Sequence, residues 1–195
     1  MKNYRSKNEE GVYNAIGHFV VEFSHLHSMM ELMSVNMISN PGSSSSRNKA
    51  WILVSDQTTY PVMSKLFSLL MEEKIDVWSS EDKNVINSIR KEIIKLIEER
   101  NRISHDIWSL GHPNTPISDE ADALRFRNTS SPKKGISKNR TPITITTIKE
   151  LIQDCIRLRE IIVKLGLYSL DDSNIKSPSQ EFELNDDQLV QVSNN

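Results

Sequence analysis

The stretch "VINSIRKEIIKLIEERNRISH", residues 85–105, decides how this 195-residue chain is expected to fold. Its isoleucines and leucine recur at steps of three and four, the period of a helix with one apolar face. Two serines at 79–80 precede it, and Glu81 and Asp82 follow them, where the helix dipole favours acidic residues. The pattern predicts a long amphipathic helix from this serine pair to about residues 104–107.

Three further stretches show the same helical period. One runs from about residue 9 to 37, a second spans residues 57–73 with Asp56 as its candidate cap, and the last runs from residue 146 or 147 to a stop near Gly166. Pro61 falls in the first turn of the second stretch or kinks it. The apolar stripe of the first helix is expected to consist of Val12, Ile16, Phe19, Phe23, Leu26, Met30 and Met33.

The segments between the helices differ in composition. "SNPGSSSSRN", residues 39–48, predicts a loop because it is rich in turn formers. Residues 109–146 contain two short alternating pieces, "ALRFRN" and "PITITT", which we interpret as a β-hairpin inserted before the last helix. We therefore predict an all-α, up-and-down bundle of four to five helices over residues 1–168, followed by an acidic, disordered tail at 169–195.

The overall composition narrows the functional classes. The net charge is −2, so any binding to nucleic acid must come from a local basic patch. Cys155 is the single cysteine, which excludes an internal disulfide and a cysteine-based zinc cluster, and its apolar neighbours predict a core residue. No apolar run has the length of a signal peptide core or of a membrane span. We expect a soluble, cytoplasmic protein without membrane contact.

Polar residues cluster at the end of the long helix. Stepping about 100° per residue from Ile86 places Arg100, Asn101 and Ser104 on the buried side and His105 at its edge. Burial of an unpaired guanidinium is costly, so this cluster must be paired, open to a cleft or part of a subunit interface.

A structural explanation of the same residues stays open. The helix end could leave the core, with Arg100 bound to a carboxylate such as Glu22 or Asp106. Periodicity does not separate this alternative from a functional site.

The chemistry of the cluster suits phosphate. Arg100 offers a planar cation for a phosphate, His105 exchanges protons near neutral pH, and Asn101 can orient either group. Such a set could cleave RNA without metal, with the imidazole deprotonating the ribose 2′-hydroxyl. A single histidine leaves the departing oxygen without an acid, which a symmetric dimer would supply.

The run "RNRISH", residues 100–105, resembles the signature of the HEPN domains, in which arginine, a polar residue and a histidine lie near the end of a bundle helix. The layout of residues 9–168 is similar, and the motif itself covers residues 99–108. The resemblance implies a metal-independent endoribonuclease, active as a homodimer, of the kind found in toxin–antitoxin and antiviral defence systems. It implies Arg100 and His105 as catalytic residues with Asn101 in support. We add Ser104 and Glu22 as supporting positions.

A basic run follows the motif along the chain. It has no acidic residue between positions 123 and 148, and it predicts contacts with an RNA backbone, although a solvated loop would have the same composition. Phe126 within it could stack on a base or pack inward. The candidate RNA-binding residues are Arg125, Arg127, Lys133, Lys134, Lys138 and Arg140.

No cofactor or metal is expected. His18, Glu22 and His25 share one side of a helix at ligand-like spacing, but three residues without a partner cluster favour ordinary polar positions. The expected partners are RNA, a second copy of the chain and an antitoxin or sensor protein. Two alternatives remain: a catalytically inactive HEPN-like module that binds RNA, a nucleotide or a protein, and a plain helical interaction subunit.

Overall fold

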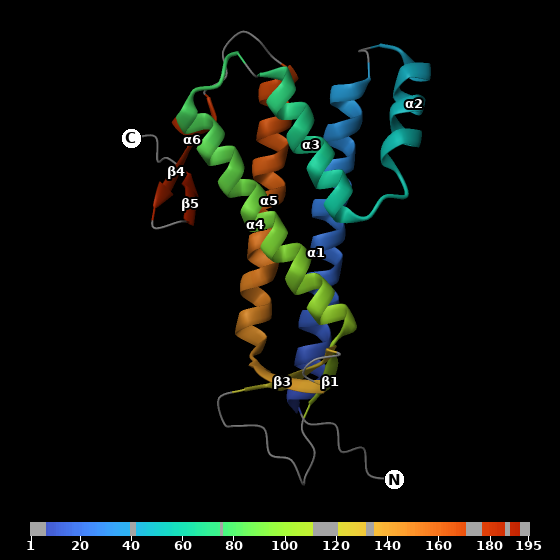
Figure 1. Ribbon diagram of the computed structural model, residues 1–195, viewed down its shortest axis with the longest axis vertical. Coiled ribbons are helices and arrows are strands. Elements are labelled where there is room, and N and C mark those ends of the chain that lie inside the picture. The colour runs from blue at the N-terminus through green and yellow to red at the C-terminus, as the bar shows by residue number, and fades with distance from the viewer. Residues whose placement is uncertain are drawn as a thin grey trace. The chain divides into compact units, whose positions relative to one another are not determined.

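The computed structural model (Figure 1) is mostly helical, with a small three-stranded antiparallel sheet. It describes residues 7–39, 42–74, 76–110, 121–131, 135–170, 177–185 and 188–191. In chain order these form α1 (Lys7–Ile38), α2 (Ser44–Val54), α3 (Thr59–Glu73), α4 (Ser80–His105), β1 (Ile107–Ser109), β2 (Ala123–Ser131), β3 (Gly135–Ile143), α5 (Ile145–Leu170), α6 (Pro178–Glu181), β4 (Phe182–Asn185) and β5 (Gln188–Gln191).

The chain divides into two compact units. The first, which we call the sheet unit, comprises residues 1–23 and 98–155, and the second, the helical unit, comprises residues 24–97 and 156–195. The boundary falls within α1, α4 and α5, so each of these helices contributes one segment to each unit. The sheet unit contains β1, β2 and β3 and the end of α4, where the polar cluster lies.

α4 begins at the predicted place because Ser79 and Asp82 cap it reciprocally. The Asp82 backbone N–H donates to Ser79 Oγ at 3.1 Å, and the Ser79 backbone N–H donates to Asp82 Oδ2 at 3.0 Å. These bonds satisfy N–H groups that have no partner within the helix. The predicted apolar face is buried in the helical unit, where Ile86, Ile89 and Ile93 are at most 1% exposed.

α1 and α5 extend somewhat beyond their predicted limits. All the residues of the expected α1 stripe are buried except Ile16, which is partly exposed. Thr144 caps α5 by accepting a hydrogen bond from the Thr147 backbone N–H at 3.0 Å. α5 ends at Leu170, slightly beyond the predicted stop near Gly166. A Cβ at Gly166 would lie 2.1 Å from Met33 Sδ, so the residue allows close helix approach.

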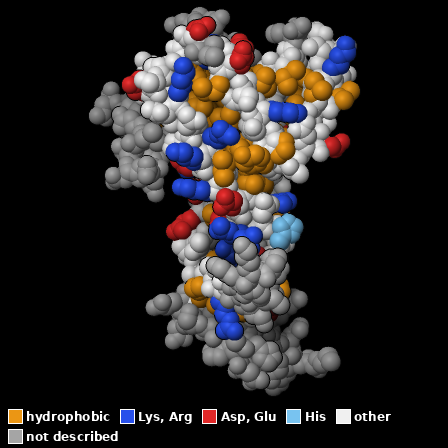
Figure 2. All heavy atoms as spheres, in the orientation of Figure 1, with side chains coloured by type: hydrophobic (Ala, Val, Ile, Leu, Met, Phe, Trp, Pro, Cys, Tyr) orange, Lys and Arg blue, Asp and Glu red, His pale blue; other side chains and the backbone are white. Residues whose placement is uncertain are grey.

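The loop predicted at residues 39–48 is only partly correct. Ser43 accepts a hydrogen bond from the Ser46 backbone N–H at 3.2 Å and starts α2 within the serine run, since serine is a favourable N-cap. α3 begins after Thr58 instead of being capped by Asp56, and Pro61 lies in its first turn as one prediction had it. Figure 2 shows hydrophobic side chains gathered over α2 and α3, and Ile52 of α2 is 78% exposed.

The strands of the sheet are arranged in the order β1-β2-β3. β2 pairs with β3 from Ala123↔Ile143 to Ser131↔Gly135. The second strand therefore differs from the predicted piece "PITITT", of which Pro142 and Ile143 end β3 and the last three residues begin α5. The Asp122 carboxylate attaches the sheet to α5 by accepting the Ile145 backbone N–H at 2.8 Å.

The acidic segment expected to be disordered is ordered in its described parts, residues 177–185 and 188–191. β4 pairs with β5, and Phe182 is only 3% exposed. The Ser179 backbone N–H donates to Asp82 Oδ1 at 2.8 Å, and Lys164 Nζ lies 2.6 Å from Glu181 Oε1. One aromatic anchor and two charge-assisted contacts therefore hold a segment whose average composition predicts disorder.

Candidate functional site

The last turn of α4 is held in the sheet unit by one apolar side chain and one indole. Ile103 is 5% exposed, and Trp108 Nε1 donates to the Ile103 carbonyl oxygen at 2.9 Å. The chain thus leaves the helix after His105 and enters β1 directly, which places β1 beside the helix end.

The polar cluster faces outward at this point. Asn101, Ser104 and His105 are exposed, and Arg100 is partly exposed. The prediction that the cluster lies on the buried side is therefore wrong, and the helix end leaves the core as the alternative had it. The predicted buried side was measured from Ile86, which belongs to the helical unit. In the sheet unit the buried residue Ile103 defines the side of the helix that faces the core.

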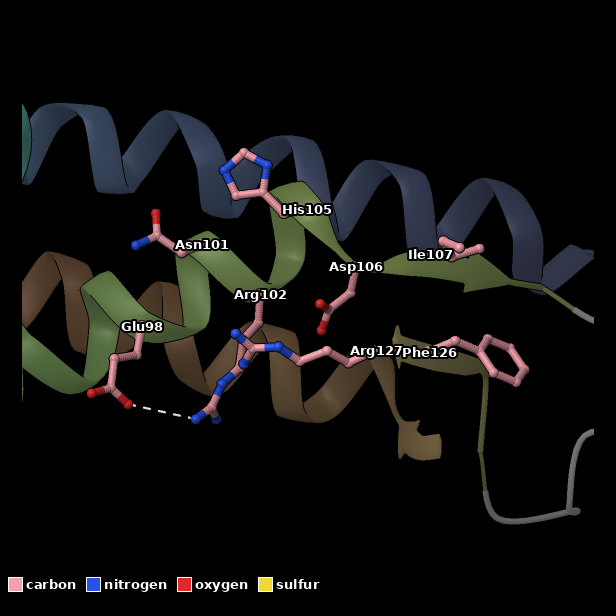
Figure 3. Close-up of a pocket in the computed structure, with 8 residues that line it drawn as sticks. All are labelled: Glu98, Asn101, Arg102, His105, Asp106, Ile107, Phe126 and Arg127. Carbon is pink, nitrogen blue, oxygen red and sulfur yellow. Dashed lines mark ion pairs between the residues drawn. The ribbon is translucent and has the colours of Figure 1, made fainter. Parts of the chain in front are cut away.

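A groove of about 670 Å³ opens beside this helix end (Figure 3). In that view Asn101 and His105 project to one side of α4, Glu98 and Arg102 project to the other, and Arg127 reaches from β2 toward Arg102. The groove therefore has an imidazole and an amide along one flank and guanidinium groups along the other. Its lining residues are Glu98, Asn101, Arg102, His105, Asp106, Ile107, Phe126 and Arg127.

Arg100 does not line this groove. Its Nη1 donates to Asn101 Oδ1 at 3.3 Å, and its guanidinium carbon lies 6.0 Å from the centre of the Phe23 ring. The two carboxylates considered as its partners have other contacts, because Asp106 pairs with Arg125 and Glu22 Oε1 lies 3.8 Å from His18 Nε2. Arg100 thus reaches the groove only through the Asn101 side chain.

Arg125 is a structural residue, which corrects its assignment to RNA binding. It is only 7% exposed, and its guanidinium bonds Glu99 Oε2 at 2.9 Å and lies 3.4 Å from Asp106 Oδ2. Arg102 joins the same network through Glu99 Oε1 at 2.5 Å and Glu98 Oε2 at 3.5 Å. These ion pairs attach β2 to the end of α4, because a buried guanidinium needs such partners.

The other basic residues differ in placement. Arg127 and Arg140 are exposed, and the Arg140 guanidinium carbon lies 5.7 Å from the centre of the partly exposed Phe126 ring. Lys138 belongs to β3, but its side chain is outside the described residues, as are Lys133 and Lys134 altogether. Of the three candidates whose side chains the structure describes, Arg127 lines the groove.

Sequence reasoning missed part of the groove lining. It did not connect Arg102 or Ile107 with the site, and it considered Asp106 as a structural partner of Arg100. The pairing of β1 with β2 brings Ile107 opposite Phe126. The signal available in the sequence was the alternating run "ALRFRN", whose two arginines share one face of a strand.

Comparisons with known proteins found no matching family model, no similar curated protein and no similar solved structure. Within the described residues, no three or more His, Cys, Asp or Glu side chains are grouped to hold a metal ion. None of the described helices is long and apolar enough to cross a membrane.

Proposed function

We propose that the groove binds RNA and that the protein is a metal-independent endoribonuclease of the HEPN kind. The observation that carries this proposal is the exposure of His105 and Asn101, one helical turn apart, in a groove that Arg127 and Phe126 also line. An accessible imidazole, an amide, a cation and an aromatic ring are the groups that RNA cleavage and recognition use. As a working assignment, the protein is a cytoplasmic toxin or defence effector.

In the proposed reaction His105 acts as the general base. Its imidazole takes the proton of a ribose 2′-hydroxyl, the 2′-oxygen bonds to the adjacent phosphorus, and the bond from phosphorus to the 5′-oxygen breaks. The products are a 2′,3′-cyclic phosphate and a 5′-hydroxyl, whose proton comes from an acid. In a homodimer His105 of the second copy would be that acid. Asn101 orients the imidazole or the phosphate, and its contact with Arg100 makes Arg100 a positioning residue.

The test is incubation of the purified protein with labelled RNA in EDTA. We expect His105→Ala to lower the rate by about 10²-fold or more, the usual contribution of a general base. His18→Ala is the matched control, because His18 is an exposed histidine outside the groove. A wild-type protein without activity on any RNA, or a His105→Ala variant as active as wild type, would contradict the proposal.

The placement of Arg100 favours a second candidate, a catalytically inactive module that binds RNA, a nucleotide or a protein. The motif arginine Arg100 lies over Phe23 and does not line the groove that contains His105. Such a module would bind RNA with an affinity that His105→Ala does not change, and it would not cleave the RNA. An antitoxin or sensor protein is a further proposed partner in either case.

A further inference from the structure

Arg127 differs from the two other arginines around the groove. Arg125 and Arg102 are both held by carboxylates, at distances between 2.5 and 3.5 Å. Arg127 is exposed, and its side chain forms no ion pair or hydrogen bond with the described part of the chain. Its guanidinium therefore has its N–H donors available to a ligand.

The carboxylates beside Arg127 are already engaged. Glu98 pairs with Arg102, Glu99 bridges Arg102 and Arg125, and Asp106 pairs with Arg125. Arg102 and Arg127 both line the groove, on the flank away from His105 in Figure 3, so two guanidinium groups border this flank. Like charges placed this way favour an anion between them. A phosphate oxygen pair fits a guanidinium especially well, because both groups are planar forks that can form two parallel hydrogen bonds.

The strand that carries Arg127 is fixed in place. Arg125 lies two residues earlier, so both side chains leave β2 on the same face. Because Arg125 is buried and anchored to Glu99 and Asp106, the position of Arg127 relative to the end of α4 is set before any ligand arrives. A preorganised cation loses less conformational entropy on binding than a free surface arginine.

We infer that Arg127 forms a phosphate subsite in the groove and there binds a backbone phosphate of an RNA strand. The inference rests on the proposed function in so far as the ligand is RNA. Since His105 projects on the opposite flank, a strand lying across the end of α4 would present different groups to the two residues. Arg127 acts in binding, and the assignment replaces the motif residue Arg100 as the phosphate ligand.

The test is the binding of a fluorescent 2′-O-methyl oligoribonucleotide, which has no free 2′-hydroxyl and is not cleaved. We expect Arg127→Ala to weaken binding about 10-fold, the scale of one charge-assisted hydrogen-bonded contact. It should also reduce the slope of log affinity against log salt concentration by about 1, because one phosphate contact is lost. Arg127→Lys keeps the charge and should retain most of the slope.

A matched variant makes the test specific. Arg47→Ala removes an exposed arginine of α2 in the other unit and should bind like wild type. Unchanged affinity and salt slope in Arg127→Ala would overturn the inference, as would an equal loss in Arg47→Ala. Arg127 is exposed, so its substitution should leave the melting temperature unchanged.

Inorganic phosphate is the second probe, because a free phosphate offers the same chemistry. We expect it to displace the oligonucleotide only weakly. Displacement at phosphate concentrations equal to those of the oligonucleotide would identify a free-phosphate site and overturn the assignment to RNA. A wild-type protein that binds the oligonucleotide through Arg127 but cleaves no RNA would leave this inference standing and remove the nuclease proposal. If Arg127→Ala cleaved RNA with the same KM as wild type, the nuclease proposal would stand and the inference about Arg127 would be overturned.

Discussion

The two ends of α4 contain similar kinds of polar residues but use them in opposite ways. At its start, in the helical unit, Ser79 and Asp82 bond each other, and Asp82 also binds the Ser179 backbone N–H. At its end, in the sheet unit, His105 is exposed beside a groove. Polar residues at a helix end therefore indicate function only where the fold leaves their hydrogen-bonding groups available.

The largest expected effect separates function from stability at the end of α4. His105→Ala should reduce RNA cleavage by about 10² to 10⁴-fold, the range of general acid–base catalysis, and leave the melting temperature unchanged. Cleavage assays in EDTA beside circular dichroism melting measure both quantities. A large loss of stability would show that His105 is structural, like the residues at the start of the helix.

Removing the buried arginine should have a large structural effect. Arg125→Ala leaves Glu99 and Asp106 without their shared cation, and removal of one partner of a buried ion pair costs about 3 kcal/mol or more. We expect a lower free energy of unfolding, measured by urea denaturation. Arg140→Ala is the control, because that arginine is exposed on the same sheet. Similar urea midpoints for the two variants would contradict the structural role of Arg125.

At the start of α4, Asp82→Ala should cost about 2 kcal/mol, since it removes both a helix cap and a buried hydrogen-bonded carboxylate. Asp82 is only 3% exposed and also binds Ser179, so the C-terminal segment should become more accessible to proteases. Limited proteolysis followed by mass spectrometry identifies the cut sites. Cleavage in the segment 177–191 should rise, and an unchanged pattern would argue against this anchoring.

The smallest expected effect is a pH dependence at the same carboxylate. Burial raises the pKa of Asp82, but hydrogen bonds from Ser179, Ser79 and Ser177 outweigh it, and the pKa lies below its ordinary value of 3.8. A lowered folded-state pKa means that Asp82 stabilises the fold above the unfolded pKa. This contribution is lost as the pH falls through the folded value.

Urea midpoints of wild type and Asp82→Asn should therefore differ most near neutral pH and converge below about pH 4. Asp76→Asn is the control, because Asp76 is exposed and its substitution should barely move the midpoint. A difference between wild type and Asp82→Asn that persists undiminished in acid would contradict the assignment.

Periodicity predicted the long helices well but predicted the orientation of their ends poorly. The buried stripe of α1 and the start of α4 follow the sequence because local apolar spacing and capping residues determine both. The outward orientation of Asn101 and Ser104 could not be predicted from helical angles measured from Ile86. This 26-residue helix is divided between the two units, and its buried direction differs between Ile86 in one unit and Ile103 in the other.

The candidate site was predicted in part. His105 and Asn101 were identified from their chemistry and spacing, and Arg127 from the basic run. Arg125, from the same run, is buried, and Arg100 lies over Phe23. Composition alone does not distinguish Arg125 from Arg127. Only strand pairing and the nearby carboxylates distinguish the anchored side chain from the available one.

Local sequence patterns were enough to predict the long helices, the capping serine at the start of α4 and an imidazole near its end. These features depend on interactions between residues a few positions apart, which a linear pattern contains. Tertiary contacts were needed to show that β1 and β2 complete a groove, that Arg125 is anchored and that Arg127 is available. Those outcomes depend on contacts between segments distant in sequence, such as Glu99 with Arg125, 26 residues apart, whose geometry no local pattern specifies.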